Sequence, residues 1–142
     1  MSPPLTLRHV PPAELPDMGP DLHEILVRMA RASHGQESAA GIEAQIRAGH
    51  WTLLGVFAGP TIIAGVTFHI SQTPQIRFLR VTYLAGQGGF QWGGTMLRKL
   101  EEIARDNGCS RLRFIGRPEW RRVLAPAGYE ATSVNYDKAI TP

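Results

Sequence analysis

A cluster of glycines is the feature whose residue types point most directly to chemistry. Five glycines lie from Gly86 to Gly94, immediately before the clearest helical pattern of the chain. The first turn of a helix has backbone N–H groups without partners and a favourable dipole, and glycines let a phosphate approach them closely. The cluster therefore predicts an anion site. The alternative interpretation is a glycine-rich turn closed by a hydrophobic plug from Phe90 and Trp92.

Arginines concentrate in the second half of the chain. Residues 1–75 carry four basic and six acidic side chains, whereas residues 76–142 carry eleven basic and six acidic ones. This asymmetry suits a polyanionic ligand or partner. On charge alone, a solvated arginine-rich face explains the asymmetry slightly better than a polyanionic ligand does. Because no nucleic-acid recognition motif accompanies the arginines, we expect no nucleic-acid partner.

The histidines and the cysteine show no pattern of a site. The five histidines lack the i, i+4 helical spacing of metal ligands, so we expect no bound metal. Cys109 is the only cysteine, which excludes an internal disulfide and a multi-thiolate site. No basic motif beside it would activate its thiol as a nucleophile, so we expect a small buried apolar residue.

Length and composition limit the function classes. The 142 residues are 43% apolar and 19% charged, which predicts one folded domain over residues 1–142 and excludes a disordered chain. No apolar run reaches the roughly 18 residues that a membrane span needs. The first four residues show no secretory signal. We therefore expect a cytoplasmic protein with no membrane partner.

Hydrophobic periodicity predicts the order β-α-α-β-β-β-α-β-α-β and an α/β fold with a mixed sheet. Both faces of the hairpin over residues 51–71 are apolar, which predicts helices on both faces of the sheet. The prolines from Pro11 to Pro20 should prevent regular structure before a first helix near Asp21. Further helices are expected near Ser38, after the glycines and at Pro118. The expected strands span residues 5–10, 51–58, 61–71, 76–84, 111–116 and 131–140.

This order, with a strand, a glycine-rich loop and a long helix at its centre, resembles the GCN5-related N-acetyltransferase (GNAT) superfamily over nearly the whole chain. The most similar stretch is Leu-Arg-Lys-Leu-Glu-Glu-Ile-Ala-Arg-Asp-Asn-Gly-Cys at residues 97–109. Residues 127–130, Ala-Gly-Tyr-Glu, are similar to the Leu-Gly-Phe-Glu ending common in these enzymes. Residues 116–120 most resemble small GNAT-like proteins of phages and prophages. The resemblance implies a single GNAT-like domain that acetylates an amine with acetyl-CoA as co-substrate.

The resemblance also implies where acetyl-CoA lies. Its pantetheine would pair with the backbone of the strand at residues 76–84, and its pyrophosphate would meet the start of the next helix. The superfamily's loop pattern, Gln/Arg-x-x-Gly-x-Gly/Ala, aligns with residues 88–93 and matches only at Gly93. Arginines beside this cleft are candidates for the 3′-phosphate of CoA. The residues implied to hold the co-substrate are Leu84, Gly88, Gly89, Gln91, Gly93, Gly94, Arg98 and Arg117.

The two catalytic positions common in the superfamily hold other residues here. The strand at residues 76–84 has no acidic residue to act as a general base, and Leu124 stands where a tyrosine commonly protonates the leaving thiolate. Proximity and an amine already neutral at working pH can supply much of the rate. Substitute candidates are Tyr83, His69 and Tyr129. Packing on the sheet is the simpler explanation for Tyr83, and a solvent-exposed strand end for His69.

No sequence motif in this chain identifies the acceptor of the acetyl group. The resemblance implies that residues 21–49 select the acceptor. It also implies that the acceptor is an amine on a small molecule or a protein. A homodimer is a further possibility that the resemblance allows. Two alternatives stay open. The first is a non-catalytic binding or assembly protein of phage origin that uses the same fold. The second, weaker alternative is a basic protein associated with nucleic acid.

Overall fold

A five-stranded mixed sheet forms the centre of the computed structural model, which describes residues 4–87, 89–115 and 121–140. The first four strands pair antiparallel with their neighbours, and the fifth pairs in parallel with the fourth. The spatial order of the strands is the same as their order in the sequence. The strands are β1 (Leu5–Val10), β2 (Thr52–Ala58), β3 (Thr61–Gln72), β4 (Arg77–Gly86) and β5 (Arg111–Phe114).

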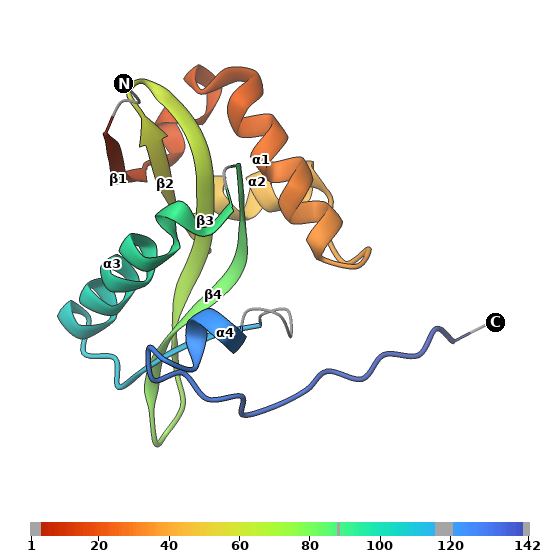
Figure 1. The fold of residues 1–142 in the computed structure, drawn as a ribbon. Helices are drawn as coiled ribbons and strands as arrows, with labels where there is room; N and C mark the ends of the chain where they lie inside the picture. Colours follow the sequence, from red (N-terminus) through yellow and green to blue (C-terminus); the bar gives the residue numbers. More distant parts are fainter. Residues whose placement is uncertain (1–3, 88, 116–120, 141–142) are drawn as a thin grey trace.

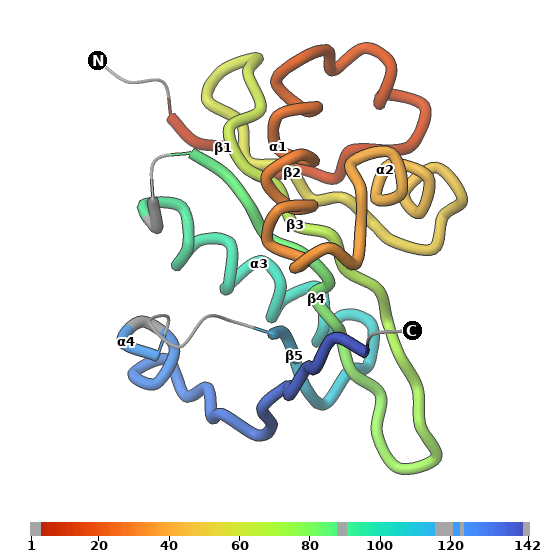
Figure 2. The backbone as a smooth tube through the Cα atoms, turned by 90° about the vertical axis from the view of Figure 1, so that its right-hand side faces the viewer, coloured from red at the N-terminus to blue at the C-terminus, as the bar shows by residue number. Residues whose placement is uncertain are grey.

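Helices cover both faces of this sheet. Figure 1 and Figure 2 show α1 (Gly19–Ala32) and α2 (Ala39–Arg47) on one face and α3 (Gly93–Asp106) on the other. No helix in the described part of the chain is long and apolar enough to cross a lipid bilayer. Three shorter helical elements are η1 (Pro12–Asp17), η2 (Gly89–Trp92) and α4 (Arg121–Leu124).

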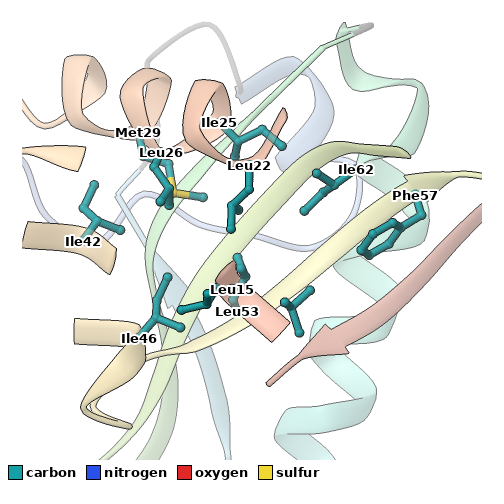
Figure 3. Packing of buried hydrophobic residues seen from close by; sticks show 11 residues of the cluster. Leu15, Leu22, Ile25, Leu26, Met29, Ile42, Ile46, Leu53, Phe57 and Ile62 are labelled. Carbon is teal, nitrogen blue, oxygen red and sulfur yellow. The ribbon is translucent and has the colours of Figure 1, made fainter. Parts of the chain in front are cut away.

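The sheet separates two clusters of buried apolar side chains. The first cluster lies under α1 and α2, where Leu22, Ile25 and Met29 meet one face of the sheet (Figure 3). The second lies under α3, around Met96 and Leu100. Side chains of β2 alternate between the two clusters. The sequence prediction of an apolar hairpin covered on both faces is thus confirmed.

Most helix boundaries follow the capping residues. Ser38 accepts a hydrogen bond at its Oγ from the Gly41 N–H at 3.0 Å and so begins α2. Gly49 and Gly108 have φ angles of +78° and +71°, which end α2 and α3 in the left-handed region that favours glycine. These boundaries agree with the sequence pattern to within about two residues.

The proline-rich segment was predicted wrongly. The structure has the 3-10 helix η1 where no regular structure was expected, and α1 begins at Gly19, before Asp21. Pro12 is the first residue of η1 and Pro20 the second residue of α1. A proline fits these positions because the N–H that it lacks has no partner in the first turn of a helix.

The C-terminal prediction also fails. Residues 131–140 form no strand, and every residue from 130 to 140 is exposed. Figure 1 shows this segment leading away from the sheet. Its sequence pattern predicts a strand, but a strand needs a partner, and this segment pairs with no strand among the described residues. The predicted strand at residues 111–116 is observed over Arg111–Phe114, while Gly116 and the helix start at Pro118 lie outside the described residues.

Candidate functional site

A fork between two strands is the central feature of the candidate site. Strand β4 pairs with β5 only from Phe78 to Val81, yet it continues to Gly86 while paired with β3. We call residues 82–86 the open segment. One backbone edge of this segment has no strand beside it in the described part of the chain. Unpaired N–H and C=O groups along such an edge can bind an extended ligand.

A β-bulge starts the open segment. In the pairing of β3 with β4, Thr67 lies opposite Tyr83 and Phe68 opposite Val81, so Thr82 is an extra residue. The hydroxyl of Thr67, which is 0% exposed, lies 2.6 Å from that of Thr82 and accepts a hydrogen bond from the Tyr83 N–H at 3.2 Å. A bulge bends and twists its strand. This bulge follows directly after the last residue paired with β5.

The start of α3 follows the open segment in the chain. Its first residue, Gly93, is buried, and its second, Gly94, is exposed. A methyl group built on Gly94 would meet only Nη1 of Arg98, at 3.7 Å. The N-cap residue, Trp92, makes no side-chain capping hydrogen bond. The first turn of α3 therefore combines free space, backbone donors without a capping side chain and a guanidinium, which together fit a phosphate.

The aromatic side chain before α3 does not fill this space. Trp92 is 5% exposed and belongs to the second apolar cluster, and its Nε1–H donates to the Gln87 carbonyl oxygen at 2.9 Å. Gln91, one residue earlier, is exposed. Gly89 begins η2. Of the residues implied to hold the co-substrate, Gly88 and Arg117 lie outside the described residues.

Leu84 and Tyr83 point to opposite faces of the open segment. Leu84 packs against the second cluster and Tyr83 against the first. The Tyr83 ring meets Trp51 edge-on, with ring centroids 5.8 Å apart. Burial raises the pKa of Tyr83, the negative charge of Glu37 raises it further, and Arg80 opposes them. The phenol is therefore protonated at neutral pH.

Two charged residues from the α1 and α2 side act on the open segment, one by contact and one by its charge, and the sequence pattern had not indicated either. The negative charge of Glu37, between α1 and α2, raises the pKa of Tyr83. Arg28 of α1 donates from Nη1 to the Gly86 carbonyl oxygen at 3.1 Å and forms an ion pair with Glu24 at 3.2 Å. The long-range packing of α1 on β4 brings Arg28 to the strand, so no local signal reveals this contact.

The structure does not bring His69 to the open segment. His69 pairs in register with Arg80, where β4 is still paired with β5. Burial lowers the pKa of His69, and the charge of Arg80 lowers it further. Its Nδ1 atom is buried with no hydrogen-bond partner among the described residues.

Tyr129 is held by α3 and lies near the fork. Its hydroxyl donates to Oε1 of Glu101 at 2.7 Å, and its ring packs on Phe114 with centroids 5.5 Å apart. Phe114 pairs with Val81, the last residue of β4 before the open segment. Burial raises the pKa of Tyr129 well above its usual value, and the hydrogen bond to Glu101 raises it further.

Other features lie away from the fork. Within the described ranges, no group of three or more His, Cys, Asp or Glu residues could hold a metal ion. Cys109 is a partly buried free thiol packed against the second cluster. A cavity of about 150 Å³ lies among η1, α1 and α2, and its lining residues include none from β4 or α3.

Comparison with known proteins identifies the fold. No protein-family model and no curated protein sequence matches the chain. Solved structures do match over nearly its whole length. A ribosomal-protein-alanine N-acetyltransferase from Brucella melitensis matches with a TM-score of 0.74 and 13% identity, covering 97% of this chain and 100% of the other. An aminoglycoside acetyltransferase from an uncultured soil metagenomic sample has a TM-score of 0.70, 12% identity and coverages of 97% and 99%.

A third match contains the co-substrate. A predicted acetyltransferase from Clostridium acetobutylicum, solved with acetyl-CoA, has a TM-score of 0.67, 14% identity and a coverage of 96% of each chain. At these identities the comparisons establish the fold. The mixed five-stranded sheet with helices on both faces is the fold of the GNAT acetyltransferases.

Proposed function

We propose that this chain transfers the acetyl group of acetyl-CoA to an amine. The observation that carries the proposal is the open segment of β4, followed in the chain by the glycine-rich start of α3. An unpaired strand edge suits the amide groups of pantetheine, and a helix start with free donors suits a pyrophosphate. The acetyltransferases among the similar structures, one of them with acetyl-CoA, support the same function.

Each part of the co-substrate has candidate partners. The backbone of Leu84 and its neighbours would hold the pantetheine, and the N–H groups at Gly93 and Gly94 would hold the pyrophosphate. Arg98 would add a charge-assisted contact to a phosphate. When bound, acetyl-CoA supplies an acyl group on a thiol leaving group. A cationic amine first loses one proton to a base. Its nitrogen then forms a bond to the acyl carbon, the carbon–sulfur bond breaks, and the second proton that the nitrogen loses neutralises the departing thiolate.

Tyr83 and Glu37 are our candidates for the acceptor side. The carboxylate of Glu37 would attract a cationic amine toward the open segment and accept its proton. The Tyr83 phenol, protonated at neutral pH, would donate a hydrogen bond there. This assignment replaces the missing acidic residue on β4 with one from the connection between α1 and α2. We also propose that the protein acts in the cytoplasm, where we expect acetyl-CoA.

Calorimetric titration with acetyl-CoA and with free CoA tests the binding. We expect micromolar affinity, about −8 kcal/mol. Gly94→Glu should weaken binding by at least about tenfold, because it places a negative charge and a long side chain at the proposed phosphate site. An acidic residue in the first turn stabilises a helix, so this variant should fold. Gly94→Ala is the matched control, because its methyl group meets nothing closer than 3.7 Å. Equal affinities of all three proteins would contradict the site.

A screen of amines for release of the CoA thiol tests catalysis. With any acceptor that reacts, Glu37→Gln should raise KM and lower kcat/KM, because the carboxylate that attracts the cation is lost. The control is Glu43→Gln on α2, whose carboxylate pairs with Arg47 at 3.4 Å. Unchanged KM in the Glu37 variant would remove that residue from the proposal.

The exposed C-terminal segment favours a second candidate function, a binding or assembly protein without catalysis. This second function predicts that titration of the folded protein with millimolar acetyl-CoA releases no detectable heat of binding. That result would also overturn the acetyltransferase proposal. The phage or prophage origin stays a prediction, and the residues 116–120 on which it depends lie outside the described residues.

A further inference from the structure

Three arginines share one face of the sheet next to the open segment. Strands β3, β4 and β5 contain four arginines and no acidic residue. Arg80, Arg111 and Arg113 lie on the face that also carries α1 and α2, because the residues that alternate with them pack toward α3 in the second apolar cluster. We call these three residues the arginine face. All three side chains are exposed, so a small ligand in solution can reach them.

The arginine face has no acidic partner among the described residues. The ion pairs within the described ranges use other cationic side chains, namely Arg8, Arg28, Arg47 and Lys99. Arg80 and Arg113 are partners in the register of β4 and β5. Like charges on neighbouring strands destabilise a sheet. An anion bound by both guanidiniums would remove this repulsion.

Packing holds one of these guanidiniums in place. The Arg113 guanidinium lies 4.4 Å from the centre of the Phe78 ring, which is a cation–π contact. The Phe78 side chain is itself buried and therefore a firm support. A guanidinium held in this way can donate to a carboxylate or a phosphate with a smaller loss of side-chain freedom on binding.

Arg80 lies beside the acceptor side of the proposed active site. It pairs with His69, whereas Tyr83, on the same face, pairs with Thr67, two residues away along β3. A strand rises about 3.3 Å per residue, so the two positions on β4 are about 7 Å apart. Burial and the charge of Glu37 raise the pKa of Tyr83, and the charge of Arg80 opposes them. A negative and a positive group therefore act on the same phenol.

We propose that the acceptor carries an anionic group as well as its amine, and that Arg80 and Arg113 bind this group. The inference rests on the proposed acetyl transfer and names its substrate class, an amine joined by a short chain to a carboxylate or a phosphate. The amine lies toward Tyr83 and the carboxylate of Glu37, and the anionic group lies on the arginine face. A diamine places its second positive charge against two guanidiniums and is a poor acceptor.

Pairs of amines that differ in the anionic group test this preference. Release of the CoA thiol is measured with 4-aminobutyrate against butylamine, and with O-phosphoethanolamine against ethanolamine. The first pair detects a carboxylate site and the second a phosphate site. We expect the anionic member of at least one pair to have a kcat/KM about tenfold higher, because it gains a charge-assisted contact. The diamine 1,4-diaminobutane should react more slowly than butylamine.

Substitutions of Arg80 test whether the arginine face causes the preference. Arg80→Gln removes one guanidinium and should bring the ratio of kcat/KM within the preferred pair close to one. Arg80→Glu reverses the charge and should make 1,4-diaminobutane a better acceptor than 4-aminobutyrate. The matched control, Arg105→Gln, neutralises an exposed arginine of α3 and should keep the native ratio. Thermal denaturation checks that each variant is folded.

The outcomes separate this inference from the proposed function. Equal kcat/KM within both pairs, or a preference that Arg80→Gln leaves unchanged, overturns the inference while acetyl transfer stands. If no amine reacts, the failure concerns acetyl transfer, and amide chemical shifts of β4 and β5 with the same four compounds decide on the anion site. Saturable shifts with an anionic compound that Arg80→Gln weakens about tenfold support the site. Absence of such shifts overturns it.

Discussion

Replacing the buried threonine of the bulge, Thr67→Val, tests how the fork is maintained. Valine has the shape of threonine but no hydroxyl. The substitution removes the acceptor of the Tyr83 N–H and places a methyl group at or near the position now 2.6 Å from the Thr82 hydroxyl. Thr82 also donates to the Thr67 carbonyl oxygen at 3.0 Å, a bond that survives the substitution.

The expected destabilisation follows from these contacts. Leaving one part-buried N–H without an acceptor costs about 1–3 kcal/mol of unfolding free energy. The approach of the new methyl group to the Thr82 hydroxyl adds to this cost, and the more apolar side chain offsets part of it. Urea denaturation with the midpoint as readout is suitable, because a slope of about 1–3 kcal/mol per molar turns this loss into a shift of roughly 1 M.

Two further variants separate the hydroxyl from packing. Thr67→Ser keeps the hydroxyl and loses one methyl group, so it should cost about 1 kcal/mol and keep the bulge. In a double-mutant cycle with Thr82→Val, the combined loss should be smaller than the sum, because the two hydroxyls contact each other. If Thr67→Val were as stable as the native chain and the serine variant less stable, packing rather than hydrogen bonding would hold the bulge.

Three further predictions concern stability. Gly86→Ala should lower the unfolding free energy by about 2 kcal/mol in thermal denaturation, because its methyl group would overlap the Ala64 Cβ and lie 2.7 Å from the Ala64 Cα. A neutral effect would mean that β4 can move away from β3. The pKa of Tyr129 is raised on folding, so above about pH 10 the unfolded chain loses a proton that the folded chain keeps, and stability should fall as pH rises. Tyr129→Phe should reduce that slope, and an unchanged slope would contradict this assignment. The pKa of His69 is lowered on folding, so below about pH 6.5 the unfolded chain binds a proton that the folded chain does not, and stability should fall as pH falls. His69→Gln should reduce this acid loss, measured as the difference in urea midpoint between pH 7 and pH 5, and an equal difference in both proteins would refute it.

The sequence pattern correctly predicted the elements whose formation depends on residues close together in the chain. The apolar stripe of α3 and its stop at Gly108 depend on residues within one helix, and both are observed. The hairpin between β2 and β3 follows from the turn at Gly59 and Pro60. The proline segment failed because prolines at the first positions of helices allow regular structure there.

The fork depends on relations between distant residues, and for that reason the sequence does not reveal it. The extra residue Thr82 is visible only when β3 and β4 are paired in register. Arg28 meets Gly86, 58 positions away, through the packing of α1 on the sheet. The charge of Glu37, which lies between α1 and α2, raises the pKa of Tyr83 across a similar separation in sequence. The C-terminal segment has the periodicity of a strand, but periodicity does not specify a partner.

The tie between Trp92 and Gln87 makes ligand affinity depend on the core. The buried indole and its hydrogen bond at 2.9 Å join the end of the glycine-rich loop to its beginning. The entropy lost in closing this loop is therefore lost during folding and not when a ligand arrives. An anion would meet donors that are already in place. Core substitutions beneath the indole, far from any ligand atom, should loosen the loop and weaken binding while the backbone donors stay chemically unchanged.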